Sequence, residues 1–494
     1  MKLLTIGIDP QLAAFRPEIS WIWRALLTGM GLGWTEVEAG AAPCDLAYVV
    51  DPRAATAPII VRAEIAKWRD PGAQVIQEVS RSGGRPHPRF VDDTVGPSFA
   101  AHDGRLVCHR DIIFDAFWLA AGVPERRWPK GPHGIFDLDQ EPAVGQGLFR
   151  DGLASDVGCA LEQVVRDRLG LEGEPRWPNG KRMAACVGHD VDYPEVYHVL
   201  EPLRVVMRQG LKGVSAACAV GTGLRHHWHF QSWTAFEQSV GLRSAFYFVP
   251  RRGSLLERVM GTPDPFYDIR HDKFRRLFRE LRESGVEIGL HASYLAYAEE
   301  DGIQREKQAV EAAAGVTVHG NRHHYWHLNP EHPTETLRRH ERAGLLYDAS
   351  LFHDRYVGWR RGLTWPYFPY DAERRRPIGT LQIPTGWMDD QLFGLKAHNP
   401  GAPTDILDDV IARVAAQRGC FMIDVHEYVY DEALFPGWAD AYRYAIRQMV
   451  DRGDVWFATP AELARHWCTR SETLAAASRG LDGARVPHAP PVRA

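Results

Sequence analysis

The stretch CVGHDVDYPEVY, Cys186 to Tyr197, places a histidine and two carboxylates where an apolar run ends. That run begins at MAACVG, Met183 to Gly188, and has the composition of a buried strand. Side chains alternate along an extended segment, so Asp190 and Asp192 are expected to point the same way. Asp192 by itself could cap a helix that begins near Pro194, but a cap leaves Asp190 unexplained. The pair therefore predicts a chemical site at the end of a strand.

Strands and helices alternate downstream of this stretch. Further strands are expected at SAFYFV (244–249), VEIGLHA (286–292), VTVHG (316–320), LQIPT (381–385), CFMIDVHEY (420–428) and VWFAT (455–459). Helices are expected at 195–209, 272–285, 305–315, 334–344, 405–419 and 441–453. Alternation of this kind implies parallel strands joined by right-handed crossovers, and six or more units predict a closed or nearly closed barrel.

The chain divides at a polar stretch, EGEPRWPNGKR, which spans Glu172 to Arg182 and is interpreted as a linker. Before it, short apolar runs such as LLTIGI alternate with amphipathic stretches such as EISWIWRALLTGMG, which predicts a smaller α/β domain over residues 1–175. The barrel is expected over 181–470. Residues 471–494 are rich in Ala, Gly, Pro and Arg and are expected to form a disordered tail.

Composition excludes several classes of function. The 494 residues carry 58 basic and 63 acidic side chains, a formal charge of −5, which does not suggest a nucleic-acid partner. Seven scattered cysteines without a CxxC pair are typical of reduced thiols, and the N-terminal residues do not resemble a secretory signal. No segment approaches a transmembrane span. We therefore expect a cytoplasmic location, while the sequence leaves the oligomeric state open.

Polar residues gather at the predicted strand ends. They are His189 to Asp192, His291, His319 to Tyr325, Asp389 with Asp390, and Asp424 with His426. The carboxyl ends of barrel strands converge on one face, so these residues are expected to meet. One Asp and two His form an open metal site suited to Zn²⁺, Co²⁺, Ni²⁺ or Fe²⁺. A second carboxylate can act as base and a separate His as acid, which completes a hydrolytic set.

The motifs GHDVDY, EIGLHASY, NRHHYW, GLLYDASL with GWRRGLTWPYFPYD, GWMDD and DVHEY occur in this order. In order and spacing they resemble the polysaccharide deacetylase superfamily, which has NodB homology and is carbohydrate esterase family four. The closest likeness is to its branch with HDVD-type text and an upstream α/β region, over Lys181 to Trp467. The resemblance implies a distorted (β/α) barrel and metal-dependent removal of an N- or O-linked acetyl group from a sugar. Zinc is the first candidate metal, with Co, Ni or Fe as alternatives.

The resemblance also implies roles for individual residues. Asp190 matches the catalytic base and Asp192 the metal-binding aspartate. His291 matches the first histidine of the metal motif. Arg322 matches the arginine that orients the base, and His426 the general acid.

One position departs from the family pattern. The second metal histidine normally follows the first by four residues, where this chain has Leu295. His324 in RHHY is the expected replacement; His323 is the alternative, and alternation puts the two on opposite faces. His189 is expected either to support the site through a hydrogen bond or to supply a third nitrogen ligand.

Tyr325, Trp365, Trp387 and Asp389 are expected to contact the substrate. The aromatic stretch VGWRRGLTWPYFPYD (357–371) fits a sugar-stacking wall and the packing of a barrel lid equally well. The expected substrate is an acetylated saccharide, such as a lipid- or nucleotide-linked sugar precursor. Two alternatives stay open: a catalytically degenerate carbohydrate-binding or scaffold protein, and a hydrolase of another non-peptide C–N bond.

Overall fold

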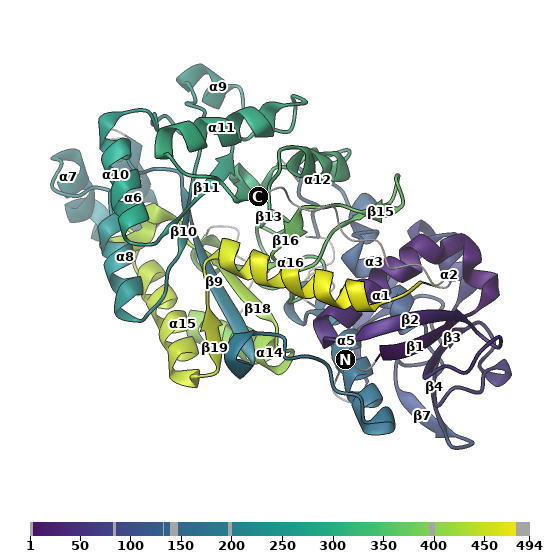
Figure 1. Cartoon of the computed structure of the whole chain (residues 1–494). Coiled ribbons are helices and arrows are strands. Elements are labelled where there is room, and N and C mark those ends of the chain that lie inside the picture. Colours follow the sequence, from purple (N-terminus) through teal and green to yellow (C-terminus); the bar gives the residue numbers. More distant parts are fainter. Residues whose placement is uncertain are drawn as a thin grey trace.

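The computed structural model describes residues 3–82, 85–131, 133–138, 147–195, 200–394 and 401–480. Two large sheets organise the chain (Figure 1). The N-terminal sheet has the order β2-β1-β3-β4-β8-β7. Its strands are β1 (Leu3–Ile8), β2 (Gly33–Glu38), β3 (Leu46–Val49), β4 (Ile59–Arg62), β7 (Phe99–His102) and β8 (Arg105–Cys108). Only β7 pairs antiparallel, so this part is the small α/β unit that the sequence predicts.

The second sheet forms the barrel, and all its pairings are parallel. Its order is β16-β13-β12-β11-β10-β9-β18-β17, with β19 beside β9. The strands are β9 (Met183–Val191), β10 (Ala245–Phe248), β11 (Glu287–Ala292), β12 (Gly320–His323), β13 (Tyr347–Asp348), β16 (Leu381–Gln382), β17 (Thr385–Met388), β18 (Cys420–Asp424) and β19 (Val455–Phe457).

One extended segment closes this barrel. The edge strands β16 and β17 are separated only by Ile383 and Pro384, so the same segment pairs with β13 through its first half and with β18 through its second. The pairing shifts by one residue between Thr385 and Trp387, a bulge of the kind that bends a strand at a barrel corner. The result is the distorted (β/α) barrel expected from the sequence.

Helices cover the outside of the barrel. They are α8 (Phe230–Ser239), α10 (Asp272–Glu283), α11 (Gly302–Ala314), α12 (Pro333–Arg342), α14 (Pro403–Ala416), α15 (Trp438–Arg452) and α16 (Pro460–Ala477). Residues that face them from the strands, such as Phe246 and Ile423, share one apolar cluster with the helices. The shorter helices α6 (Leu200–Gln209), α7 (Val214–Gly221) and α9 (Leu255–Val259) lie in the connections after β9 and β10. None of the helices in the described ranges has both the length and the hydropathy needed to cross a bilayer.

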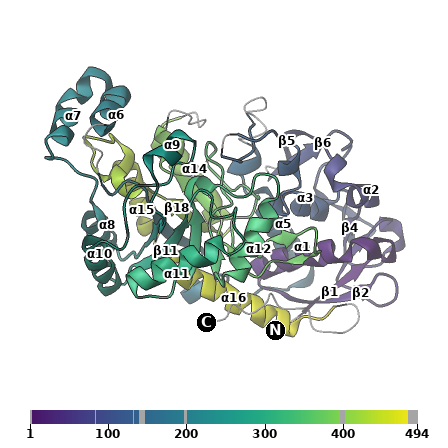
Figure 2. The same ribbon diagram turned by 90° about the horizontal axis from the view of Figure 1, so that it is seen from above.

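The N-terminal unit and the barrel share one continuous core. Helices α1 (Arg16–Met30), α3 (Ile112–Ala120) and α5 (Leu153–Leu169) pack on the N-terminal sheet, and α16 runs from the barrel towards it (Figures 1 and 2). Glu125 accepts hydrogen bonds from Arg360 and Arg361 across the junction. In the expected linker, Trp177 is 1% exposed and donates to the Arg418 carbonyl, so the linker is an anchored part of this core.

Two sequence expectations are corrected by the structure. The tail was expected to begin at 471, but α16 continues to Ala477 because Leu474 and Ala475 are buried, and Arg479 then pairs with β2 at Trp34 and Glu36. Residues 481–494 lie outside the described residues. The strand expected at 316–320 is observed as β12 at 320–323, because pairing with β11 begins at Asn321.

Candidate metal and catalytic site

Three buried side chains converge at the carboxyl end of the barrel strands. Asp192 directly follows β9, His291 lies in β11, and His324 directly follows β12. Asp192 Oδ1 lies 3.2 Å from His291 Nε2 and 3.5 Å from His324 Nε2. One ligand atom from each of the three falls within 4.8 Å of the other two. The structure therefore brings together the three residues that the sequence assigns to a metal.

Hydrogen bonding fixes which nitrogen of each histidine faces the cluster. His291 Nδ1 donates to the Arg322 carbonyl at 2.7 Å, and His324 Nδ1 donates to Asp264 Oδ1 at 3.1 Å. With Nδ1 protonated in both rings, each Nε2 offers a lone pair to the same point. Asp192 Oδ1 and His324 Nε2 have no hydrogen-bond partner among the described residues although both are buried. Two nitrogens and one oxygen with unused lone pairs fit a divalent metal that retains open positions.

Buried charges of opposite sign shift the pKa values of His324 and Asp192. Burial lowers the pKa of His324, but the negative charges of Asp192 and Asp264 outweigh it and raise that pKa to about 10. Burial raises the pKa of Asp192, but His324 and His291 outweigh burial and hold it well below its usual range. Without a metal, a proton on His324 therefore balances the Asp192 carboxylate; a bound cation would take the place of that proton and free the Nε2 lone pair.

Asp264 is a site residue that the sequence did not predict. It lies in the connection after β10, is fully buried, and also accepts from the Tyr294 backbone N–H at 2.8 Å and from Arg251 at 2.9 Å. Its stretch, TPDPFYD, carries no periodicity that would have singled it out.

The expected base is held by an arginine that two carboxylates share. Arg322 Nη1 lies 2.8 Å from Asp190 Oδ1 and 2.8 Å from Asp424 Oδ1, and all three side chains are buried. Burial raises the pKa of Asp424 well above its usual range; Arg322 opposes this and the charge of Asp190 adds to it. Asp190 Oδ2 lies 3.6 Å from His291 Nε2, so this carboxylate borders the cluster.

A glycine makes room for that arginine. A Cβ at Gly188 would lie 2.5 Å from the Tyr247 ring and 2.8 Å from Arg322 Nη2. The arginine in turn lies over the Tyr247 ring, 4.7 Å from its centroid. Because both neighbours are fixed inside the barrel, only glycine fits at this position of β9.

His426 reaches the cluster from the other side. Its Nε2 lies 3.7 Å from Asp192 Oδ2, while Nδ1 donates to Asp389 Oδ1 at 2.9 Å. The His426 backbone N–H also donates to Asp389, at 2.8 Å. Burial lowers the pKa of His426, but the Asp389 charge outweighs it and raises that pKa well above its ordinary value. Asp389, which is expected to contact the substrate, holds this histidine in place; its contact with the substrate stays a prediction.

Two other histidines point away from the cluster. His189 bonds Glu237 at 2.7 Å and the Val425 carbonyl at 3.0 Å, and its ring stacks on Phe246 on the helix-covered side of β9. The ligating role considered for His189 is therefore wrong, because strand alternation turns its ring outwards. Its bond to the Val425 carbonyl, between Asp424 and His426, leaves the supporting role as a prediction. His323 pairs with His340 at 2.8 Å, so the alternative ligand also faces outwards.

The aromatic residues expected to contact the substrate lie in two different environments. Tyr325 is half-buried beside the site, with its ring 4.7 Å from that of His324. Trp365 is fully buried at the junction with the N-terminal unit, where its Nε1 donates to the Ala25 carbonyl and Arg176 covers its ring. Trp387 is fully buried in the cluster that contains Trp359. Both tryptophan predictions are wrong, because these rings fill the protein core.

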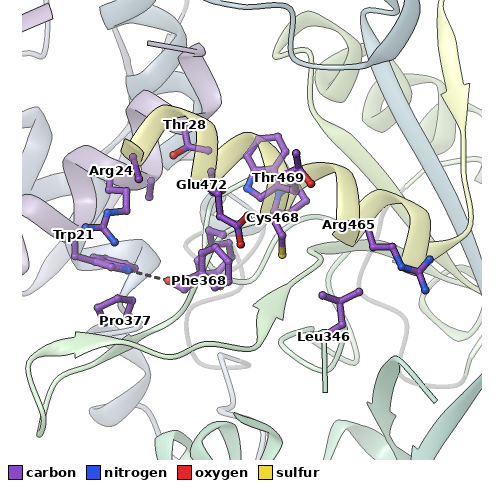
Figure 3. A pocket seen from close by; sticks show the side chains of 16 residues that line it. Trp21, Arg24, Thr28, Leu346, Phe368, Pro377, Arg465, Cys468, Thr469 and Glu472 are labelled. Carbon is purple, nitrogen blue, oxygen red and sulfur yellow. Dashed lines mark hydrogen bonds between the residues drawn. The ribbon is translucent and has the colours of Figure 1, made fainter. Parts of the chain in front are cut away.

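A cavity of about 300 Å³ lies elsewhere, between α1, α16 and the segment 366–368 (Figure 3). Trp21 crosses it and donates to the Phe368 carbonyl at 2.8 Å. Leu346, which lines it, immediately precedes β13, so the cavity is at the amino ends of the barrel strands. The cluster of Asp192, His291 and His324 is at the opposite ends.

Comparisons with known proteins return structures only. No protein-family model matches the chain, and no curated protein does. The fold is similar to a protein named as a polysaccharide deacetylase from Mycobacterium smegmatis, at 20% identity, 64% of this chain, 96% of that chain and a TM-score of 0.38. It is also similar to Puue allantoinase, at 16% identity over 60% of this chain and 94% of that chain, with a TM-score of 0.40. The peptidoglycan deacetylase PdaC from Bacillus subtilis matches at 13% identity over 60% of this chain and 96% of that chain, with a TM-score of 0.28. Because all three TM-scores are 0.40 or lower, function is inferred from the residues of the site alone.

Proposed function

We propose that this chain is a metal-dependent hydrolase that removes an N- or O-linked acetyl group from a saccharide. One observation carries the proposal: a buried Asp–His–His set lies between an arginine-held carboxylate and an aspartate-held histidine. These are the groups that metal-dependent hydrolysis of an acyl bond uses: a metal site, a general base and a general acid.

Asp192, His291 and His324 would hold the metal, through one oxygen and two Nε2 atoms. A divalent metal in such a set supplies a Lewis acid that polarises an acyl carbonyl and lowers the pKa of water.

Asp190 is assigned as the general base. Arg322 holds one of its oxygens at 2.8 Å, which leaves the other, on the side of His291, to take a proton from the attacking water. His426 is assigned as the general acid. Its Nδ1 is bound to Asp389, so its Nε2 faces the cluster and can deliver a proton to the departing amine or alcohol.

The saccharide part of the proposal is supported by the motif resemblance. The alternating strands carry its residues in the family's order, and Leu295 and His324 are the one departure in the metal motif. A lipid- or nucleotide-linked sugar is the proposed substrate class.

The first test combines metal content with turnover. After purification without chelator, or reconstitution with Zn²⁺ or Co²⁺, we expect about one metal per chain and release of acetate from acetylated sugars. Asp190→Asn should keep the metal and lose about 10²–10⁴-fold in turnover. A wild-type chain without metal under either condition would favour the degenerate binding protein. A metal-loaded chain that hydrolyses cyclic ureides and rejects acetylated sugars would favour the other C–N hydrolase.

A further inference from the structure

Exposed apolar side chains are concentrated on two insertions beside the site. Thirteen large apolar side chains are exposed in the described part of the chain, and nine of them lie in the connections after β9 and β10. We call these nine the apolar rim: Leu203, Met207, Leu211, Val214, Leu224, Leu255, Leu256, Val259 and Met260. Leu211 is 90% exposed and Met260 77%. Clusters of this kind mark a surface that binds something apolar.

The rim residues are spaced to form faces. Leu203 and Met207 lie four residues apart on one side of α6, and the exposed Leu211 follows in the next turn, after α6 ends at Gln209. In α9, Leu255, Leu256 and Val259 likewise fall on one face, and Met260 continues it. Each insertion therefore presents an apolar stripe outwards, while Val205 of α6 is buried beneath.

Both insertions surround the carboxyl ends of the strands that carry the site. α6 and α7 pack mainly on each other and project from the barrel, and α9 lies on the same side (Figure 2). Tyr193, which follows Asp192, lies under the guanidinium of Arg258, 5.8 Å from its ring centroid. Leu295, four residues after His291, is a further exposed apolar side chain, 40% exposed, in the connection after β11.

The charge of the insertions is opposite to that of the whole chain. Residues 200–225 and 251–262 carry seven Lys or Arg and two Glu, whereas the chain has a formal charge of −5. Lys212 and Arg252 are exposed among the rim residues, whereas Arg208 is paired with Glu201. Apolar stripes flanked by cations are the pattern of surfaces that lie in the interface of an anionic membrane.

We propose that the apolar rim inserts into the interface of an anionic membrane and holds the barrel mouth over a lipid-anchored saccharide. The substrate half of this proposal, that the bound molecule is a lipid-anchored saccharide, rests on the proposed function. The membrane half, that the apolar rim inserts into an anionic membrane, does not. A bilayer is favoured over a protein partner because the rim is carried by two separate projecting insertions, and because both insertions carry an excess of basic residues.

Vesicle flotation tests the membrane half with the full chain. We expect the wild type to float with vesicles of equal phosphatidylglycerol and phosphatidylcholine, and to bind pure phosphatidylcholine more weakly. L203Q/M207Q/L211Q should bind about a hundredfold more weakly, because three apolar side chains no longer enter the interface. The matched control is V75Q/V91Q/V95Q, which changes three exposed valines of the N-terminal unit and should bind as the wild type does. Thermal unfolding should show that both variants fold.

Three results would overturn the membrane half: no flotation of the wild type, equal losses in the two triple variants, or a rim variant that loses an oligomer while vesicle binding is unchanged. Acetate release from a water-soluble acetylated disaccharide separates the two proposals. The rim variant should keep this activity and lose only the stimulation that anionic vesicles give with a lipid-anchored acetylated saccharide. Flotation without any acetate release would refute the proposed function and leave the membrane surface standing.

Discussion

Replacement of Asp264 by Asn should weaken metal binding without removing a ligand. Asp264 Oδ1 accepts from His324 Nδ1 at 3.1 Å in a fully buried setting, so its charge both fixes the ring and makes Nε2 a stronger donor to a metal. Asn has nearly the same shape and keeps one acceptor oxygen for His324 and Tyr294, while its NH2 group replaces the oxygen that accepts from Arg251.

The expected loss follows from the change in that hydrogen bond. A bond to a charged group contributes about 1.5–3 kcal/mol and a neutral one about 0.5–1.5 kcal/mol. The difference, about 1–1.5 kcal/mol, corresponds to about a tenfold increase in the dissociation constant of the metal. This is the lower end of the range, about 10- to 100-fold, found when the partner of a metal-bound histidine is removed.

Competition with a chromogenic zinc chelator measures this constant directly. Arg251→Gln is the matched control, because it removes the other charged partner of Asp264 and leaves the bond to His324 in place. We expect the control to stay within about threefold of the wild type. An Asp264→Asn variant with wild-type affinity, or a control that loses as much, would refute the role of Asp264 in orienting His324.

Three further predictions concern neighbouring groups. His324→Ala should lose stoichiometric metal whereas His323→Ala should keep it, as measured by metal analysis after gel filtration; the reverse result would exchange their roles. Asp389→Asn should keep metal and lose about a hundredfold or more in turnover, because His426 loses its charged partner; unchanged turnover would contradict that pairing. Burial raises the pKa of Glu125, but the two arginines across the junction outweigh it and lower that pKa from 4.5 to about 2. Glu125 therefore contributes stability above pH ~4.5 that is lost as pH falls towards ~2. Glu125→Gln should lower the free energy of unfolding by about 3 kcal/mol at pH 7, and the difference in urea denaturation should shrink between pH 5 and pH 3; a constant difference would contradict the shift.

The sequence predicts the residues that lie in or directly after strands. Asp190, Asp192 and His291 could be placed together because parallel strands bring their carboxyl ends to one edge, whatever the loops do. Alternation along the strand also predicted that His323 and His324 face opposite sides, as the contact of His323 with His340 shows.

Residues whose position depends on loop paths or on packing could not be predicted. Asp264 lies between α9 and α10 in a segment without regular structure, so spacing carries no information about it. Trp365 lies in the stretch 357–371, whose composition fits a sugar-binding wall and a packed core equally well. Which of the two forms depends on the N-terminal unit, whose helix α1 covers Trp365. The outward turn of His189 follows from the same alternation that turns Asp190 inwards, yet its role depended on Glu237, 48 residues away.

In the proposed metal site, His324 takes the place of a histidine at 295, and this changes what would hold the site together. Two histidines four residues apart would sit on one local segment, whereas His291 and His324 come from neighbouring strands. Their separation is set by the pairing of His291 with Arg322 and by the 2.7 Å bond from the His291 ring to the Arg322 carbonyl. A shift of one residue in the pairing of β11 with β12 would turn His324 outwards and separate it from Asp192 and His291. Metal affinity in this chain is therefore coupled to barrel register, so metal should raise the melting temperature of the wild type in proportion to its binding and should leave that of His324→Ala unchanged.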